Sequence, residues 1–378
     1  MPLLGRHERD SMRPELRDVI EYRKSGLSVN WIVGCPLDCG YCVRHLFDNY
    51  DMKVPKALMT DTAAVRMLLD HQYFQPHITP IQLLNRATDP MLPRVKQHLF
   101  EALRMLDARE LTNQVLVITR WRIEHEDCAF FNSLRHIRLT VLVTHSGIDN
   151  EQVEPVDSGI AANSLRIAHD HADRYRVILY WRPIVAGLND SDEHLRRAFE
   201  LSYHAHATVF TGLFYKEQIR AYYQANGLPE PYDEAARRKV FPETLEQRIL
   251  AGAAEHGVGS PLFRKTSCAV TYAHGVADYN GHYGIRGLCD ICPGSQQHKC
   301  EEAWQRPDRA RVAEMTERLG GQFLGMTDGA IVVSGLAEPP RYLMQHTFAF
   351  QVHDAARPHH PSHHGRADIG WPTIKETP

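Results

Sequence analysis

Three cysteines, Cys35, Cys39 and Cys42, stand close together in the stretch CPLDCGYC. Three thiolates this near one another can hold one iron–sulfur cluster. Because a [4Fe–4S] cluster has four irons, three protein ligands leave one iron open to a ligand that is not protein. The alternative is a zinc site, although zinc usually takes four ligands in paired CxxC arrangements.

A second set of cysteines follows the spacing C-x20-C-x2-C-x7-C and comprises Cys268, Cys289, Cys292 and Cys300. Asn280-Gly281 lies between the first two and is a strong turn signal. It predicts a β-hairpin that returns Cys268 toward Cys289. Four thiolates could ligate a second [4Fe–4S] cluster or a structural zinc ion, and the spacing leaves both open.

Short polar residues follow several apolar runs. LNRATDP carries Asn85, Thr88 and Asp89, THSG carries Thr144 and Ser146, and RPIVAGLND carries Arg182 and Asn189. The side chains of Asn85, Thr88 and Asp89 can accept hydrogen bonds from an ammonium group. Asp89 precedes a proline and could instead cap a helix.

Six apolar or β-branched runs must position these residues, and we expect them to be strands. They cover residues 27–34, 78–84, 114–119, 137–144, 176–181 and 208–214, with expected helices at 61–69, 92–106, 127–134, 161–172 and 192–203. Alternation of buried strands with helices predicts parallel βαβ units. Six units make an α/β fold of the partial (βα)6 TIM-barrel type, with its chemistry at the C-terminal strand ends.

The CxxxCxxC spacing, with Tyr41 before the last cysteine, resembles the radical S-adenosylmethionine (SAM) superfamily. Thr88-Asp89-Pro90 and the stretch from Arg182 to Asp190 resemble its spore photoproduct lyase-like branch. The chain departs from most of the superfamily, which has Gly-Gly-Glu near residues 84–90. The resemblance implies that SAM binds the open iron and is cleaved to a 5′-deoxyadenosyl radical, which abstracts hydrogen from a substrate.

By this resemblance the SAM contacts are Tyr41, Asn85, Thr88, Asp89, Thr144, Ser146, Arg182 and Asn189. The later cysteines resemble the auxiliary-cluster (SPASM or twitch-like) extensions of the superfamily, which implies a second [4Fe–4S] cluster. A reducing donor such as flavodoxin or ferredoxin is implied as a partner. For the radical-quenching residue the sequence offers only Cys128 and Tyr283, and a packing role accounts for either.

Composition narrows the functional class. The net charge of −3, with 43 Lys+Arg against 46 Asp+Glu, gives no basic field for capturing nucleic acid. No apolar run reaches the roughly 18 residues that a membrane span needs, and the first residues lack the apolar core of a secretion signal. We therefore expect a cytoplasmic enzyme without membrane contact, whose cysteines bind metal rather than form disulfides.

The leading hypothesis is a radical SAM enzyme acting on a small molecule, sugar, nucleotide or peptide, as in natural-product biosynthesis. Alternatives are nucleic-acid repair or modification of the spore photoproduct lyase type, and a non-catalytic metal-stabilised binding protein. The expected organisation is an N-terminal extension (1–27), the barrel (28–255), a Cys-rich auxiliary-cluster domain (256–305), a small α/β segment containing strands (306–354) and a flexible His/Pro-rich tail (355–378).

Overall fold

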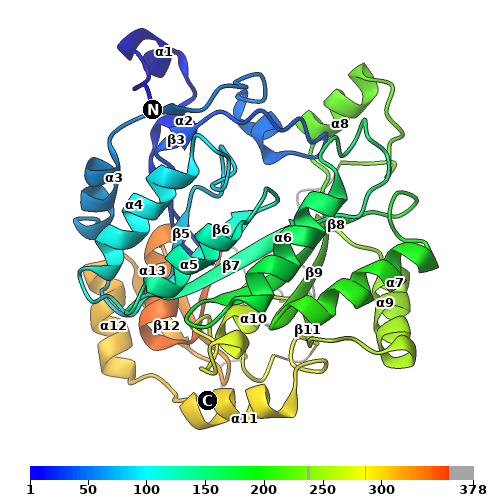
Figure 1. The fold of residues 1–378 in the computed structure, drawn as a ribbon. Helices are drawn as coiled ribbons and strands as arrows, with labels where there is room; N and C mark the ends of the chain where they lie inside the picture. The colour runs from blue at the N-terminus through cyan, green and yellow to red at the C-terminus, as the bar shows by residue number, and fades with distance from the viewer. Residues whose placement is uncertain (236–238, 286, 357–378) are drawn as a thin grey trace.

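A large, mostly parallel sheet forms the centre of the molecule (Figure 1). The computed structural model describes residues 1–235, 239–285 and 287–356, and within them the sheet order is β1-β2-β5-β6-β7-β8-β9-β10, with β11 also paired to β9. The strands are β1 (Ile20–Arg23), β2 (Gly26–Val29), β5 (Ile81–Leu83), β6 (Gln114–Thr119), β7 (Arg138–His145), β8 (Arg176–Ile184), β9 (Ala207–Phe214), β10 (Lys239–Val240) and β11 (Leu262–Phe263). All neighbours from β2 to β9 pair in parallel. The expected parallel α/β sheet is confirmed.

Helices separate the parallel strands and cover the outer face of the sheet, as Figure 1 shows for α4 to α7. They are α3 (Asp61–Leu69), α4 (Lys96–Asp107), α5 (His125–Ser133), α6 (Ser158–Asp170) and α7 (Asp192–Leu201). In α4 the buried Leu99, Leu103 and Leu106 recur at helical spacing, so one face packs on the strands. The predicted strand–helix alternation is confirmed.

The segment after β11 packs against the inner face of the sheet. Helix α10 (Thr266–Ala273) places Ala269 and Val270 in one apolar cluster with Ile178 and Tyr180 of β8 and Val209 of β9. Cys268 lies in this helix and packs against the same cluster. The space inside the curved sheet is therefore filled by the Cys-rich segment.

The hairpin expected around Asn280-Gly281 is wrong. Residues 266–273 are helical, and Asp278–Gly281 is a turn, closed by the Gly281 amide donating to the Asp278 carbonyl at 3.3 Å. Gly281 has φ +65°, and a Cβ there would meet the Ala349 carbonyl. The apolar run after Cys268 is buried against β8 and β9 as a helix, which satisfies its own backbone, so the turn forms without the flanking strands of a hairpin.

The C-terminal region adds a three-stranded sheet within the described residues, ordered β12-β13-β14. Its elements are α11 (Gly294–Ala303), α12 (Arg309–Arg318), β12 (Gln322–Met326), β13 (Ala330–Ser334), α13 (Glu338–Phe348) and β14 (Gln351–Asp354). Strands were expected within 306–354, and β12, β13 and β14 lie there; residues 338–348 form α13, because prolines in the first turn favour helix initiation. The expected flexible tail lies outside the described residues from position 357 onward.

The remaining elements flank the sheet. They are α1 (Arg6–Ser11), α2 (Pro14–Arg17), the short pair β3 (Ile32–Val33) and β4 (Lys56–Ala57), the 3-10 helix η1 (Val43–Phe47), the 3-10 helix η2 (Ser202–His204), α8 (Glu217–Ala225) and α9 (Glu243–His256). Among the described residues, no helix combines the length and apolar character that crossing a membrane requires.

Candidate functional site

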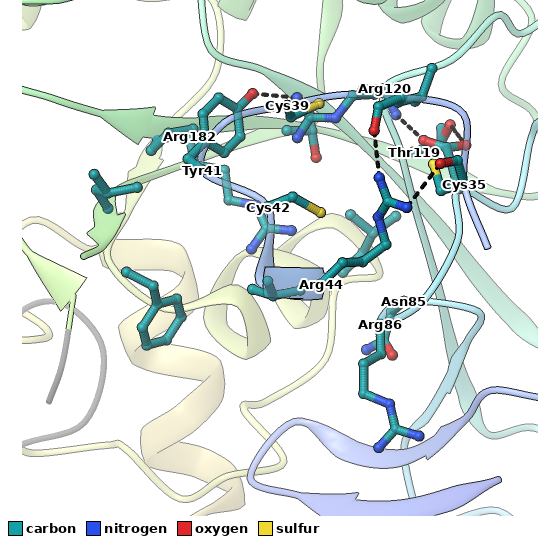
Figure 2. A pocket seen from close by; sticks show the side chains of 18 of the residues that line it. Cys35, Cys39, Tyr41, Cys42, Arg44, Asn85, Arg86, Thr119, Arg120 and Arg182 are labelled. Atoms are coloured by element: carbon teal, nitrogen blue, oxygen red, sulfur yellow. Dashed lines mark hydrogen bonds between the residues drawn. The ribbon is translucent and has the colours of Figure 1, made fainter. Parts of the chain in front are cut away.

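A cavity opens where the parallel strands end, and the three-cysteine loop forms one of its walls (Figure 2). Cys35, Cys39 and Cys42 line it from the loop between β3 and η1. The opposite walls are residues that follow or end β5, β6, β7, β8 and β9. The C-terminal ends of these strands lie at one edge of the sheet, so the cavity has the position expected for chemistry in folds of this kind.

Arg44 fixes the shape of the cysteine loop. Its side chain is buried and donates to the carbonyl oxygens of Cys35 at 2.9 Å and Leu37 at 2.6 Å. It also donates to Tyr50 at 3.0 Å and Met52 at 3.4 Å. One guanidinium therefore binds carbonyls on both sides of the loop and holds the three cysteines in place.

The thiols of this loop lie in an apolar environment. Cys35 and Cys39 are buried, and burial raises the pKa of Cys35 to about 11 and the pKa of Cys39 above its ordinary value. A metal that binds thiolates must therefore displace protons from these groups.

Six of the eight side chains assigned to SAM line this cavity: Tyr41, Asn85, Thr88, Asp89, Thr144 and Arg182. They come from the cysteine loop and from the ends of β5, β7 and β8. The hydroxyl of Thr88 is buried and has no hydrogen-bond partner within the described residues. It therefore offers a fully buried, unused polar atom to a ligand.

Asp89 and Asn85 already have protein partners. Asp89 accepts from the Thr119 hydroxyl at 2.6 Å, from the Arg120 amide at 2.8 Å and from the Met91 amide at 2.9 Å. Burial raises the pKa of Asp89, and these hydrogen bonds oppose that rise. The side-chain carbonyl of Asn85 accepts from the Ser28 hydroxyl at 2.6 Å. Both residues therefore help to build the wall that they line.

Ser146 and Asn189 lie behind the cavity and are not among its lining residues. Both are buried, and the side-chain amide of Asn189 donates to the backbone carbonyls of Ser146 at 2.6 Å and Pro183 at 2.8 Å. The Ser146 hydroxyl donates to Glu154 at 3.0 Å. In this arrangement the two side chains join the ends of β7 and β8.

A buried carboxyl, Glu154, lies beside the cysteine loop. It accepts from the Cys39 thiol at 3.4 Å and from the Arg120 guanidinium at 2.6 Å, and it also contacts the Tyr41 hydroxyl. Burial raises the pKa of Glu154 to about 8. Glu154 thus links the loop to the end of β6 through Arg120.

A second, smaller cavity is lined by Cys268, Cys289, Cys292 and Cys300. The Cys300 sulfur accepts from the Asp278 amide and from the Gln296 side chain, each at 3.5 Å. Burial raises the pKa of Cys300, and these two donors oppose that rise. The predicted convergence of Cys268 with the later three cysteines is therefore present, although a helix and a turn produce it.

Asp278 and His282 share this second cavity. Their side chains approach at 2.9 Å, and one carboxylate oxygen of Asp278 and Nε2 of His282 are buried without a partner among the described residues. Ligand atoms of Cys268, Asp278 and His282 all lie within 4.8 Å of one another. This trio is a possible mononuclear metal site beside the cysteines.

Neither candidate for the radical-quenching residue lines the first cavity. Cys128 is buried in α5, and its sulfur lies 3.8 Å from the Ile167 carbonyl of α6, on the outer side of the sheet. Tyr283 lines the second cavity.

Sequence reasoning missed Arg44, Glu154 and Lys239, which all belong to this region. Lys239 lines the first cavity from β10, whereas Glu154 acts from a loop after β7. Arg44 stands two residues after the third cysteine, which is a signal that sequence reasoning could have used. Glu154 and Lys239 lie in stretches without a motif.

No family model matches the chain, and no curated protein matches it. Solved structures resemble it at low identity. A single-residue variant of spore photoproduct lyase is 14% identical over 66% of this chain and 79% of that one, with a TM-score of 0.49. The lyase complexed with dinucleoside spore photoproduct is 13% identical over 65% and 79%, with a TM-score of 0.48. SuiB of Streptococcus suis, bound to the precursor peptide SuiA, is 9% identical over 62% and 47%, with a TM-score of 0.43.

Proposed function

We propose that the chain is a radical SAM enzyme that binds SAM and a [4Fe–4S] cluster in the first cavity and abstracts hydrogen from an organic substrate. The observation that carries the proposal is the opening of Cys35, Cys39 and Cys42 onto one cavity at the C-terminal strand ends. Three thiols with polar side chains opposite them are what a cluster with one open iron requires.

Sulfur spacing supports a cluster over zinc at this loop. Sulfurs around a tetrahedral zinc ion are about 3.8 Å apart, because each Zn–S bond is about 2.3 Å. Among the described residues, the loop cysteines form no set of three ligand atoms within 4.8 Å. The wider arrangement suits a group larger than a single ion.

When bound, the cluster supplies the electron that cleaves SAM to a 5′-deoxyadenosyl radical. The chain's own residues orient the reactants and exclude water. Arg44 holds the loop carbonyls and thereby the cysteines. The unpartnered Thr88 hydroxyl and the neighbouring Asn85 and Asp89 face the place where the amino group of SAM would bind, and Tyr41, Thr144 and Arg182 line the rest of the cavity.

We assign the second cavity to an auxiliary [4Fe–4S] cluster held by Cys268, Cys289, Cys292 and Cys300. These four cysteines line one cavity. As in the first loop, no three of their sulfurs form a set within 4.8 Å in the described residues, a spacing that suits a cluster. The competing assignment is a zinc ion on Cys268, Asp278 and His282. An external reductant such as flavodoxin or ferredoxin would supply electrons, and the substrate would be a small molecule or a peptide.

The test is iron and sulfide content with electron paramagnetic resonance after anaerobic reconstitution. Wild type is expected to hold about eight irons, and the triple variant Cys35→Ala, Cys39→Ala, Cys42→Ala about four. Only wild type should give a reduced-cluster signal that SAM perturbs. Cys128→Ala removes a buried thiol outside both cavities and should leave the iron content unchanged.

Two outcomes would contradict parts of the proposal. A wild-type resonance signal that does not change when SAM is added would contradict the radical SAM assignment. About four irons falling to none in the triple variant, with one zinc retained, would assign the second cavity to zinc. A Cys289→Ala, Cys292→Ala variant separates the two sites, because it should lose the auxiliary irons and keep the SAM-responsive signal.

A further inference from the structure

Two cations of the first cavity, Arg182 and Lys239, lack an acidic partner. Arg182 ends β8 and Lys239 begins β10, and both line the cavity with the three cysteines. Within the described residues Arg182 makes no hydrogen bond or ion pair, and its guanidinium carbon lies 3.9 Å from the centre of the Tyr180 ring. Lys239 donates only to the Thr211 hydroxyl, at 3.1 Å.

The other cations of the cavity are already satisfied. Arg120 pairs with Glu154 at 2.6 Å, Arg86 pairs with Glu21 at 3.2 Å, and Arg44 is bound by backbone carbonyls. The one carboxylate among the lining residues is Asp89, which accepts three hydrogen bonds from its own surroundings. Arg44 likewise has no carboxylate partner but has five backbone acceptors, so Arg182 and Lys239 are the cavity cations left with the fewest protein partners among the described residues.

Burial makes these charges costly. Burial lowers the pKa of both Arg182 and Lys239, Tyr180 opposes both shifts, and the positive charge of Arg182 lowers the pKa of Lys239 as well. Lys265 precedes α10 and lines the second cavity. Burial lowers its pKa, and the charge of Lys239 contributes to that fall. The positive region thus extends from the first cavity toward the auxiliary cysteines.

SAM alone cannot balance this region. It carries a sulfonium and an ammonium against a single carboxylate, so its net charge is positive. A [4Fe–4S]2+ cluster on three thiolates would carry one negative charge, which the positive charge of SAM would offset, so neither group balances Arg182 and Lys239. Guanidinium and ammonium groups at the end of parallel strands are suited to a carboxylate or a phosphate, which the guanidinium can bind through two parallel hydrogen bonds.

We propose that Arg182 and Lys239 bind an anionic group of the substrate, a carboxylate or a phosphate, at the strand ends beside the three-cysteine loop. The Thr211 hydroxyl supports the ammonium of Lys239, and the Tyr180 ring supports the guanidinium of Arg182. This inference rests on the proposed function, because it names the substrate class of the same site: an organic anion.

The experiment measures anion binding by titration calorimetry on the reconstituted full-length protein saturated with SAM. The probes are malonate, phosphate and sulfate, so that the arms distinguish a carboxylate from a phosphate preference. Lys239→Met should weaken binding at least tenfold, whereas Lys239→Arg keeps the charge and should stay within about threefold of wild type. The matched control is Lys56→Met. Lys56 lies on β4, outside the cavity, and pairs with Glu8.

Equal binding by wild type and Lys239→Met, or no binding by wild type, would overturn the proposal. Because Lys239→Arg retains the charge, recovery of binding in that variant excludes simple misfolding as the cause of a loss. The same titration without SAM keeps the two proposals apart. Lys239-dependent binding in a protein with no SAM-responsive signal would leave the anion site standing and remove the radical SAM assignment.

Discussion

The Asp89 carboxylate accepts from the Thr119 hydroxyl at 2.6 Å and from the Arg120 amide at 2.8 Å, which ties the loop after β5 to the end of β6. Asp89 therefore both lines the cavity and holds two segments of its wall together. Its oxygens also accept from the Met91 amide, so three donors depend on one buried side chain.

Asp89→Ala should destabilise the protein by about 3 kcal/mol, because it leaves several buried donors without an acceptor. Thr119→Val should cost about 1–2 kcal/mol, since Asp89 keeps its two backbone donors. Urea unfolding of both variants and of the double variant measures these losses. If the two residues act through one another, the double variant will be less destabilised than the sum of the singles. Additive losses would contradict the coupling.

Arg44→Met should destabilise the cysteine loop. The substitution removes the donors to five carbonyls, of Cys35, Leu37, Asn49, Tyr50 and Met52, and should cost about 3 kcal/mol or more. It should also lower the iron retained after reconstitution.

Lys53→Met is the matched control for Arg44→Met, because it removes another cation that binds the cysteine loop, through Asp38. Lys53 pairs with Asp38 at 2.5 Å, with its side chain 38% exposed, so its loss should cost about 0–1 kcal/mol. Iron analysis and urea unfolding compare the two variants. An equal, small loss in both would show that Arg44 does not fix the loop.

The parallel sheet and its covering helices were predictable because their signals are local. The apolar run 114–119 and the helix at 61–69 coincide with β6 and α3, since a continuous apolar run and helical periodicity are both patterns within a few residues. The three-cysteine loop was likewise visible, because its residues are adjacent in sequence.

The supporting residues of the site were not predictable, because their contacts join distant parts of the chain. Glu154 meets Cys39 and Tyr41 from a loop more than a hundred residues away, and Lys239 reaches the cavity from a two-residue edge strand. The predicted hairpin failed for the same reason. Burial of α10 against the inner face of β8 and β9 decides that segment, and no local pattern encodes that face.

His346 should make stability sensitive to acid. It is buried in α13 between the Tyr22 hydroxyl, 2.8 Å from Nδ1, and the Lys24 carbonyl and Asn280 side chain, 3.1 and 3.0 Å from Nε2. Burial lowers its pKa to about 4, whereas an unfolded histidine titrates near 6.5. The unfolded state therefore binds the additional proton between these values, and stability falls as the pH falls from about 6.5 to 4.

The expected loss from His346 is about 1.4 kcal/mol per pH unit within that window. Denaturant unfolding at several pH values should give a shallower acid slope for His346→Gln than for wild type. His136→Gln, which changes an exposed histidine, should leave the slope as it is. An unchanged slope in His346→Gln would mean that this residue does not carry the acid sensitivity.

Anion binding at Arg182 and Lys239 should weaken at alkaline pH. The pKa of Lys239 is lowered to about 8, chiefly by burial; Tyr180 opposes this fall, and the charge of Arg182 contributes to it. The pKa of Tyr180 is also about 8: burial raises it, and the charges of Arg182 and Lys239 lower it by more. Above that pH the lysine loses its charge and the tyrosine gains a negative one, and both changes disfavour an anion. The charge of Lys239 also contributes to the lowered pKa of a third cation, Lys265.

Sulfate is the suitable probe for this dependence, because its own charge is constant over the range. Its affinity should fall about tenfold between about pH 7 and pH 9 in wild type, as the charged fraction of a lysine with a pKa near 8 falls by that factor. In Lys239→Arg the guanidinium stays charged, and any remaining decline reports Tyr180. Tyr180→Phe in that background should remove the decline. A wild-type affinity that does not change with pH would contradict Lys239 as the ligand, since a sulfate held by other cations would not follow its titration.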